Sequence, residues 1–385
     1  MAPAIAILTL SGMQKEKTKL NELAGVFVKL GLTAFGGPAA HIAMMQQEVV
    51  EKRKWMDYPH FLDLIGATNL IPGPNSTEMA IHIGHERGGW KGLLVAGSCF
   101  IMPAVLITGV IAWLYQLYGQ LPQVTPFIYG IKPAVIAIIL GAVLPLARKA
   151  LKTVELAVIG VLALLASLAG ANEIFVLFGA GLVVLLLYVC RRPGPERRSD
   201  VPLLFLHVPF LSEANSRIFL VFLKIGAILY GSGYVLFAFL DSELVSRGML
   251  SRTQLIDAIA VGQFTPGPVF SSVTFIGWQM NGLPGAIWAT MAVFLPSFVF
   301  VALLNPLVPR MRKSRLFSAF LDGVNIASVA IIGTVCISFG RETVRDWRTM
   351  LIVALSAITV FGFRKVNTVW VVIGSGIAGY GLSLL

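Results

Sequence analysis

Three short Gly/Pro motifs are suited to begin helices whose first backbone amides have no partner. They are Gly36-Gly37-Pro38, Pro72-Gly73-Pro74 and Pro266-Gly267-Pro268. Glycine can adopt the required turn, proline suits the first helical position, and the amides that follow carry roughly half a positive charge in total. Polar side chains follow the two Pro-Gly-Pro motifs: Asn75, Ser76 and Thr77 come after the motif at 72–74, and Ser271 and Ser272 come after the motif at 266–268. Free amides with hydroxyl groups predict a cradle for a tetrahedral oxyanion, formed without metal or covalent chemistry.

Few ionisable side chains lie inside the apolar stretches, where each costs at least about 2.5 kcal/mol unless it has an interior partner or water. Those that bear on function are Lys29, Lys224, Glu78, Asp63 and Asp257. The two lysines would either supply positive charge to a bound dianion or extend to the membrane surface. The three acids are candidates for proton coupling. For the two aspartates, capping a helix or pairing with a lysine is the alternative.

Several kinds of chemistry have no motif in this chain. Cys99, Cys190 and Cys336 lie in apolar runs, and no Cys-x-x-Cys or Cys/His spacing occurs. We therefore expect no metal site and no disulfide framework. The phosphate-binding loop of ATP-hydrolysing proteins is absent from the sequence, as are zinc-protease, serine-hydrolase and aspartyl-protease motifs. We expect neither a cofactor nor an enzymatic activity.

The composition indicates a protein with several membrane spans. Of the 385 residues, 56% are hydrophobic and only 13% charged, against roughly a quarter charged in soluble domains. The mean hydropathy is +0.81. The net charge of +11 arises from short basic tracts between apolar segments, as expected for cytoplasmic loops rather than for a nucleic-acid partner. The bilayer is the predicted environment, specifically the inner (plasma) membrane.

An internal repeat organises the chain. Residues 27–31 (FVKLG) correspond to residues 222–226 (FLKIG), the two Pro-Gly-Pro motifs correspond to each other, and Pro103 corresponds to Pro296. The offset drifts only from 195 to 193 residues along the way. This register predicts an N-terminal segment (1–20), a first repeat (21–190), a basic linker (191–216) and a second repeat (217–385).

Each repeat contains six apolar stretches. They lie near 22–46, 60–84, 92–118, 126–147, 154–169 and 174–190 in the first repeat, and near 217–240, 254–277, 285–308, 319–339, 349–363 and 366–384 in the second. Several exceed the roughly 20 residues that span hydrocarbon. The first two of each repeat are interrupted by Gly/Pro clusters, which predicts discontinuous or re-entrant helices. The expected fold is therefore an all-α polytopic membrane protein.

The charges of equivalent loops alternate between the repeats. Residues 119–123 carry no charge, whereas 310–315 carry four basic residues; the tract at 191–198 carries four arginines, whereas the chain after the last stretch carries none. Basic loops stay in the cytoplasm, so the repeats are predicted to have inverted topology, with 119–123 and Leu385 outside. The lysines within residues 15–19 do not fit this topology, because it would place these basic residues outside.

The Phe35-Gly36-Gly37-Pro38 motif and the duplicated Pro-Gly-Pro motifs resemble those of the chromate ion transporter family, in its long-chain, two-domain form. The resemblance covers about residues 22–384. It implies efflux of chromate across the membrane, with sulfate as a similar competitor, and hence chromate resistance. Ser232-Gly233 replaces Gly37-Pro38 in the second repeat, which suggests unequal contributions of the halves to the site.

Three functions remain open at this point. The leading one is a secondary transporter that exports chromate or a sulfate-like oxyanion, driven by membrane potential, a proton gradient or both. The alternatives are a proton-coupled importer of sulfate or another oxyanion, and an anion channel. The sequence leaves the physiological anion and the coupling ion undetermined, and a homodimer is compatible with it.

Overall fold

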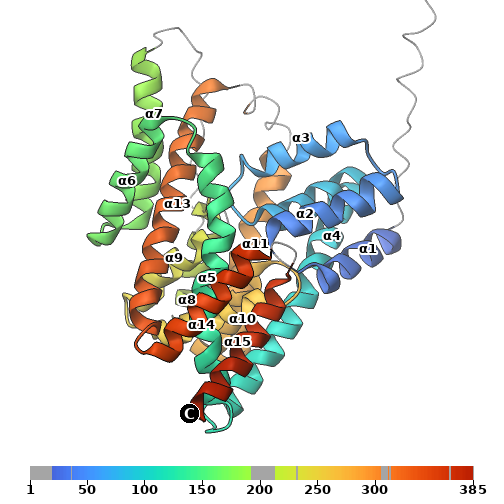
Figure 1. The fold of residues 1–385 in the computed structure, drawn as a ribbon. Helices are drawn as coiled ribbons and strands as arrows, with labels where there is room; N and C mark the ends of the chain where they lie inside the picture. Colours follow the sequence, from blue (N-terminus) through green and yellow to red (C-terminus); the bar gives the residue numbers. More distant parts are fainter. Residues whose placement is uncertain are drawn as a thin grey trace, which may run out of the picture.

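Helices account for all the regular secondary structure in the described part of the chain. The computed structural model describes residues 20–35, 37–191, 213–230, 233–304, 311, 314–363 and 366–384. Helices of the first repeat are α1 (Leu20–Thr33), α2 (Pro38–Gln46), the π-helix η1 (Gln47–Lys52), α3 (Tyr58–Thr68), α4 (Asn75–Tyr118), α5 (Thr125–Ala150), α6 (Val154–Leu168) and α7 (Glu173–Arg191). Figure 1 shows their arrangement.

The second repeat has the same order of elements, with one short 3-10 helix added before its helical hairpin. They are α8 (Glu213–Ile228), α9 (Val235–Leu240), the π-helix η2 (Asp241–Val245), α10 (Arg252–Phe264), the 3-10 helix η3 (Val269–Ser271), α11 (Ser272–Leu304), α13 (Arg315–Thr343), α14 (Trp347–Gly362) and α15 (Thr368–Ser383). Residues 1–19 of the predicted N-terminal segment, most of the linker, Gly36 and Ser232 lie outside the described residues.

The predicted helix breaks are confirmed. The first apolar stretch divides into α1 and α2, and the second is interrupted between α3 and α4. Within α4 the backbone leaves the helical region at Gly89 (φ 57°), and a Cβ placed on Gly84 would overlap the Gly92 carbonyl. The two segments of α4 therefore fold back on each other as a hairpin. Gly282 (φ 58°) makes the equivalent hairpin within α11.

The last two helices of each repeat pack on the other repeat. Helices α6 and α7 contact α13, whereas α14 and α15 contact α5 (Figure 1). Glycines permit the closest approaches: Gly323 of α13 lies against Gly181 of α7, and Gly130 of α5 lies against Gly379 of α15. This exchange ties the halves together.

Helices α5 and α13, which are equivalent in the two repeats, run in opposite directions. Lys152, just beyond the end of α5, pairs with Asp322 near the start of α13 (2.6 Å). At the other end, Tyr129 of α5 donates a hydrogen bond to Asp346, which follows α13 (2.5 Å). Two contacts at opposite ends of both helices fix the antiparallel arrangement.

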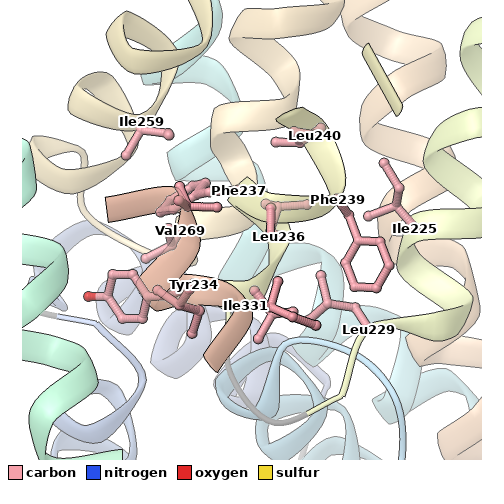
Figure 2. Packing of buried hydrophobic residues seen from close by; sticks show 14 of the residues in the cluster. Ile225, Leu229, Tyr234, Leu236, Phe237, Phe239, Leu240, Ile259, Val269 and Ile331 are labelled. Atoms are coloured by element: carbon pink, nitrogen blue, oxygen red, sulfur yellow. The ribbon is translucent and has the colours of Figure 1, made fainter. Parts of the chain in front are cut away.

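The short helix α9 lies inside the largest hydrophobic cluster of the described residues. All six of its residues are buried, and Figure 2 shows Leu236, Phe237 and Phe239 packed among Ile225 and Ile331. Its counterpart α2 buries only His41 and Met45. The second repeat therefore places its broken helix in the interior, whereas the first places it near the periphery.

The length and apolar composition of its helices indicate that the protein is a membrane protein. In the described part of the chain, five segments are long and apolar enough to cross a bilayer: α4, α5, α7, α13 and the segment Val269–Leu303 that joins η3 to α11. Helices α6, α14 and α15 are apolar but shorter. Many of their large apolar side chains are exposed, such as Leu106, Leu162 and Ile377, as is expected for surfaces that contact lipid.

Candidate functional site

The three Gly/Pro motifs begin helices that no side chain caps. Gly37, Gly73 and Gly267 all have positive φ angles, of 84°, 141° and 90°, which glycine adopts without strain. Helices α2, α4 and η3, which follow them, have no side-chain cap. By contrast, Asp57, Ser251 and Asp346 cap α3, α10 and α14. The glycine breaks thus leave amide donors available in the interior.

One detail of the predicted helix starts is corrected. Only Pro38 occupies the first helical turn. Pro74 and Pro268 stand one position earlier, at the N-cap, with extended backbone angles. Proline lacks an amide donor, so the first donors of these helices belong to Asn75 and Val269.

Each Pro-Gly-Pro break docks on the opposite repeat. The Gly73 amide donates to the carbonyl of Leu229 (2.7 Å), and the Gly267 amide donates to the carbonyl of Ala34 (2.8 Å). These bonds are equivalent, because Ala34 and Leu229 follow the corresponding helices α1 and α8. Gly37 also faces the other repeat, since a Cβ there would lie 3.2 Å from the Tyr234 hydroxyl. All three breaks therefore lie where the repeats meet.

Buried polar atoms surround the first Pro-Gly-Pro break. A methyl group on Gly73 would overlap Oε1 of Glu78 and Oγ of Ser297. Glu78 and Ser297 are fully buried, and neither Glu78 oxygen nor the Ser297 hydroxyl has a hydrogen-bond partner among the described residues. Tyr230 lies close enough to interact electrostatically with Glu78. We call Gly73, Glu78, Ser297 and Tyr230 the first-break cluster.

The equivalent place in the second repeat is much less polar. A Cβ on Gly267 would lie 2.9 Å from Cβ of Ala104 and 3.2 Å from the Gly31 carbonyl. In the alignment of the two repeats, Ala104 of the first repeat corresponds to Ser297 of the second, and Glu78 of the first corresponds to Ser272 of the second. The two breaks share a backbone geometry but differ in chemistry: Gly73 adjoins a carboxyl group and a hydroxyl from the opposite repeat, whereas Gly267 adjoins a methyl group and backbone carbonyls.

The polar residues that were predicted to follow the breaks differ in burial and in hydrogen bonding. Thr77 and Ser272 are fully buried, and their hydroxyls have no partner within the described ranges. Ser76 lies 3.2 Å from Nδ1 of His41. Ser271 accepts a hydrogen bond from Thr108 (3.3 Å). Asn75 is only half-buried, and its amide donates to Asn69 (2.8 Å).

Lys29 and Lys224 form equivalent ion pairs away from the breaks. Lys29 Nζ lies 2.8 Å from Glu48 on η1, and Lys224 Nζ lies 2.6 Å from Glu243 on η2. The glutamates are buried, whereas both lysine side chains are about half exposed. Hydrogen bonds from Lys29 and then Lys52 hold the pKa of Glu48 at about 2. Each pair joins the first helix of a repeat to its π-helix, and a role in binding the anion stays a prediction.

The two candidate aspartates have different surroundings. Asp63 is exposed on α3. Asp257 is 4% exposed; it lies 3.3 Å from Lys132 of α5 and accepts a hydrogen bond from Tyr115 of α4 (2.7 Å). The Lys132–Asp257 pair thus crosses between the repeats. Asp257 and Tyr115 also line a groove of about 240 Å³.

Comparison with known proteins agrees with this duplicated architecture. The sequence profile of the chromate transporter family matches the chain twice, over residues 21–185 and 216–380. The chain belongs to the chromate transporter family. It is 30% identical over 372 residues to a probable chromate transport protein of Synechococcus elongatus, covering 94% of this chain and 95% of that protein. A chromate transport protein of Cupriavidus metallidurans is also 30% identical, with coverages of 94% and 92%. No solved structure matches the chain significantly.

Two residues of the first-break cluster, Ser297 and Tyr230, could not be predicted from the sequence motifs. Ser297 follows Pro296, and Tyr230 lies two residues after the end of α8, far from the Pro-Gly-Pro motifs. A signal for Ser297 was present, because the repeat alignment places it opposite Ala104. That substitution of a polar for an apolar residue becomes meaningful only once the structure puts both positions beside a glycine break.

Proposed function

We propose that this chromate transporter family member exports chromate, or a closely similar tetrahedral oxyanion, across the cytoplasmic membrane as a secondary transporter. One observation carries the proposal: uncapped helix starts and unpartnered buried polar atoms come together between the two repeats. Curated relatives over nearly the full chain are named chromate transport proteins, which supports the choice of anion.

The first-break cluster is suited to bind an oxyanion. Backbone amides and hydroxyl groups donate hydrogen bonds to oxygens in any direction around a tetrahedron, and a helix N-terminus favours negative charge. In the structure the Glu78 and Ser297 side chains of the cluster are closed to solvent, because they have no exposed surface. Since it contains elements of both repeats, movement of one repeat against the other would open it to either side.

We further propose that the repeats have inverted topology. The antiparallel packing of α5 and α13 supports this orientation. So does the grouping of charge: Arg191 and Arg315 line one groove at the same end of the molecule. At the opposite end, Phe127 near the start of α5 stacks on Tyr380 near the end of α15 (4.7 Å). That end carries the uncharged 119–123 loop and the C-terminal helix (Figure 1).

The membrane potential favours export of an anion. Moving one charge across 100 mV is worth about 2.3 kcal/mol, so a dianion that leaves an inside-negative cell gains about 4.6 kcal/mol. Uptake against this field would require two or three coupled protons. Export is therefore the direction that needs no further energy source.

Everted membrane vesicles test the proposal. Chromate should accumulate inside them with saturable kinetics when the lumen is positive, and collapse of the potential should slow the flux. The control is the same preparation without this protein. Flux that depends only on a pH gradient would favour the proton-coupled importer, and flux that does not saturate would favour a channel.

A further inference from the structure

Glu78 is the one acid in the first-break cluster, and no described cation pairs with it. The titratable groups around it are Tyr230 just after α8, His82 one turn further along α4 and His41 of α2, which contacts Ser76. His82 is fully buried, and neither of its ring nitrogens has a partner within the described residues. Among the described residues, the acid therefore faces hydroxyl, imidazole and amide groups and no carboxylate or lysine.

A dianion bound at this cluster determines the protonation state of Glu78. An ionised carboxylate beside a dianion would put three negative charges in a space without solvent, where charge repulsion is weakly screened. A carboxylic acid instead donates its O–H to the anion, and hydrogen bonds of the type O–H···O⁻ are among the strongest in proteins. Binding of the anion thus requires that Glu78 carry its proton.

We propose, on the basis of the function proposed above, that Glu78 selects oxyanions by their basicity. The carboxylic acid proton is shared with an oxygen of the bound anion, so Glu78, its proton and the dianion together carry a net charge of −2, against −3 with an ionised carboxylate. No bond to the central atom forms or breaks. The hydroxyls of Ser297 and Thr77 and the backbone amides bind any oxyanion, whereas the acid binds best to one that readily accepts a proton.

Basicity distinguishes anions that charge and shape do not. Hydrogenchromate is a weak acid, so chromate is a fairly basic dianion, whereas sulfate and selenate derive from strong acids. Selenate is tetrahedral, doubly charged and close to chromate in size. Selection by size predicts that selenate competes like chromate; selection by the Glu78 proton predicts that selenate competes like sulfate.

The experiment measures inhibition of radiolabelled chromate uptake into everted vesicles by unlabelled chromate, selenate and sulfate. In the unaltered protein, chromate should inhibit at concentrations at least tenfold lower than selenate, and selenate should behave like sulfate. Glu78→Gln keeps a hydrogen-bond donor but cannot share a proton. This variant should lose the preference, with chromate and selenate inhibiting at similar concentrations.

Ser272→Ala is the matched control, because it removes a buried hydroxyl at the position equivalent to Glu78 without touching an acid. It should leave the ratio between chromate and selenate unchanged, whatever it does to the absolute affinity. Equal inhibition by selenate and chromate in the unaltered protein, or a preserved preference in Glu78→Gln, would overturn the proposal. Because the first of these outcomes needs no variant, a misfolded Glu78→Gln leaves the test intact. Absence of chromate transport would instead refute the proposed function itself.

Discussion

Gly73 is the residue at which backbone geometry and site chemistry coincide. Its φ of 141° and its contacts with Glu78 and Ser297 leave no room for a side chain. Gly73→Ala should therefore displace these groups and lower the apparent affinity for chromate roughly ten- to a hundredfold, which corresponds to about 1.5–3 kcal/mol for a lost hydrogen bond to a charged ligand. The measurement is the concentration dependence of vesicle transport at equal protein expression.

Two other glycines make this prediction specific. Gly170 has φ of 86°, but a Cβ on this residue would meet nothing within 4 Å, so Gly170→Ala reports backbone strain alone and should leave affinity unchanged. Gly267→Ala meets Ala104 and a backbone carbonyl, and should reduce stability more than affinity. Equal losses of affinity in Gly73→Ala and Gly267→Ala would show that both breaks bind the anion alike.

Lys29 provides a second test at the level of single residues. Because it pairs with Glu48 and is half exposed, we expect Lys29→Gln to leave chromate affinity unchanged. It should lower thermal stability slightly, because Glu48 keeps Lys52 as a partner at 2.9 Å and ion pairs with a solvent-exposed lysine contribute about 0–1 kcal/mol. The low pKa of Glu48 keeps this carboxylate ionised. The contribution is then complete above its ordinary pKa and is lost only as the pH falls toward about 2, so the stability difference should be the same between about pH 6 and 8.

Lys224→Gln is the matched variant for this prediction, because Lys224 forms the equivalent pair with Glu243. The two variants should behave alike. A clear loss of chromate affinity in either one, without loss of folded protein, would assign that lysine to the anion site.

At the scale of elements, the Lys132–Asp257 pair joins α5 of one repeat to α10 of the other. Removal of one partner leaves a largely buried charge, which costs about 3–5 kcal/mol when the pair is fully buried and less here because Lys132 is 21% exposed. Asp257→Asn should therefore destabilise the protein, and the double variant Lys132→Asn/Asp257→Asn should recover part of the loss. Thermal unfolding in detergent measures the coupling.

The double variant also separates two interpretations of Asp257. If this residue only joins the helices, recovery of stability should bring recovery of transport. If it takes part in proton coupling, transport should stay impaired although the fold is restored. Asn325, the residue equivalent to Lys132 in the second repeat, shows that asparagine is accommodated at this place in the fold.

The sequence was informative about elements and less so about contacts between them. Glycine and proline act through local backbone geometry, so the breaks before α2, α4 and η3 could be predicted from their motifs. The hairpin at Gly89 and the pairing of Lys29 with Glu48 depend on which surfaces meet, and no local pattern encodes that. The same holds for Ser297, which reaches Gly73 only because α11 of the second repeat packs beside the first-repeat break.

At the scale of the whole molecule, the proposed inverted topology predicts which loops face the cytoplasm. In a chain whose native cysteines are replaced by serine, Arg191→Cys and Arg315→Cys should react with an impermeant thiol reagent only from the cytoplasmic side. Gln123→Cys should react only from outside. Labelling of residues 123 and 315 from the same side would refute the inverted topology.

The exchange of helices between repeats also bears on how the chain is made. Helix α5 leaves the ribosome long before α14 and α15, so the surface around Gly130 that α15 finally covers stays open while the second repeat is synthesised. Helices α6 and α7, in turn, are already in the membrane when α13 emerges and can receive it at once. We therefore expect the first repeat to be inserted before its packing is complete, and the second repeat to pack against it afterwards. Until α15 is inserted, the surface of α5 around Gly130 should be in contact with lipid or with the insertion machinery.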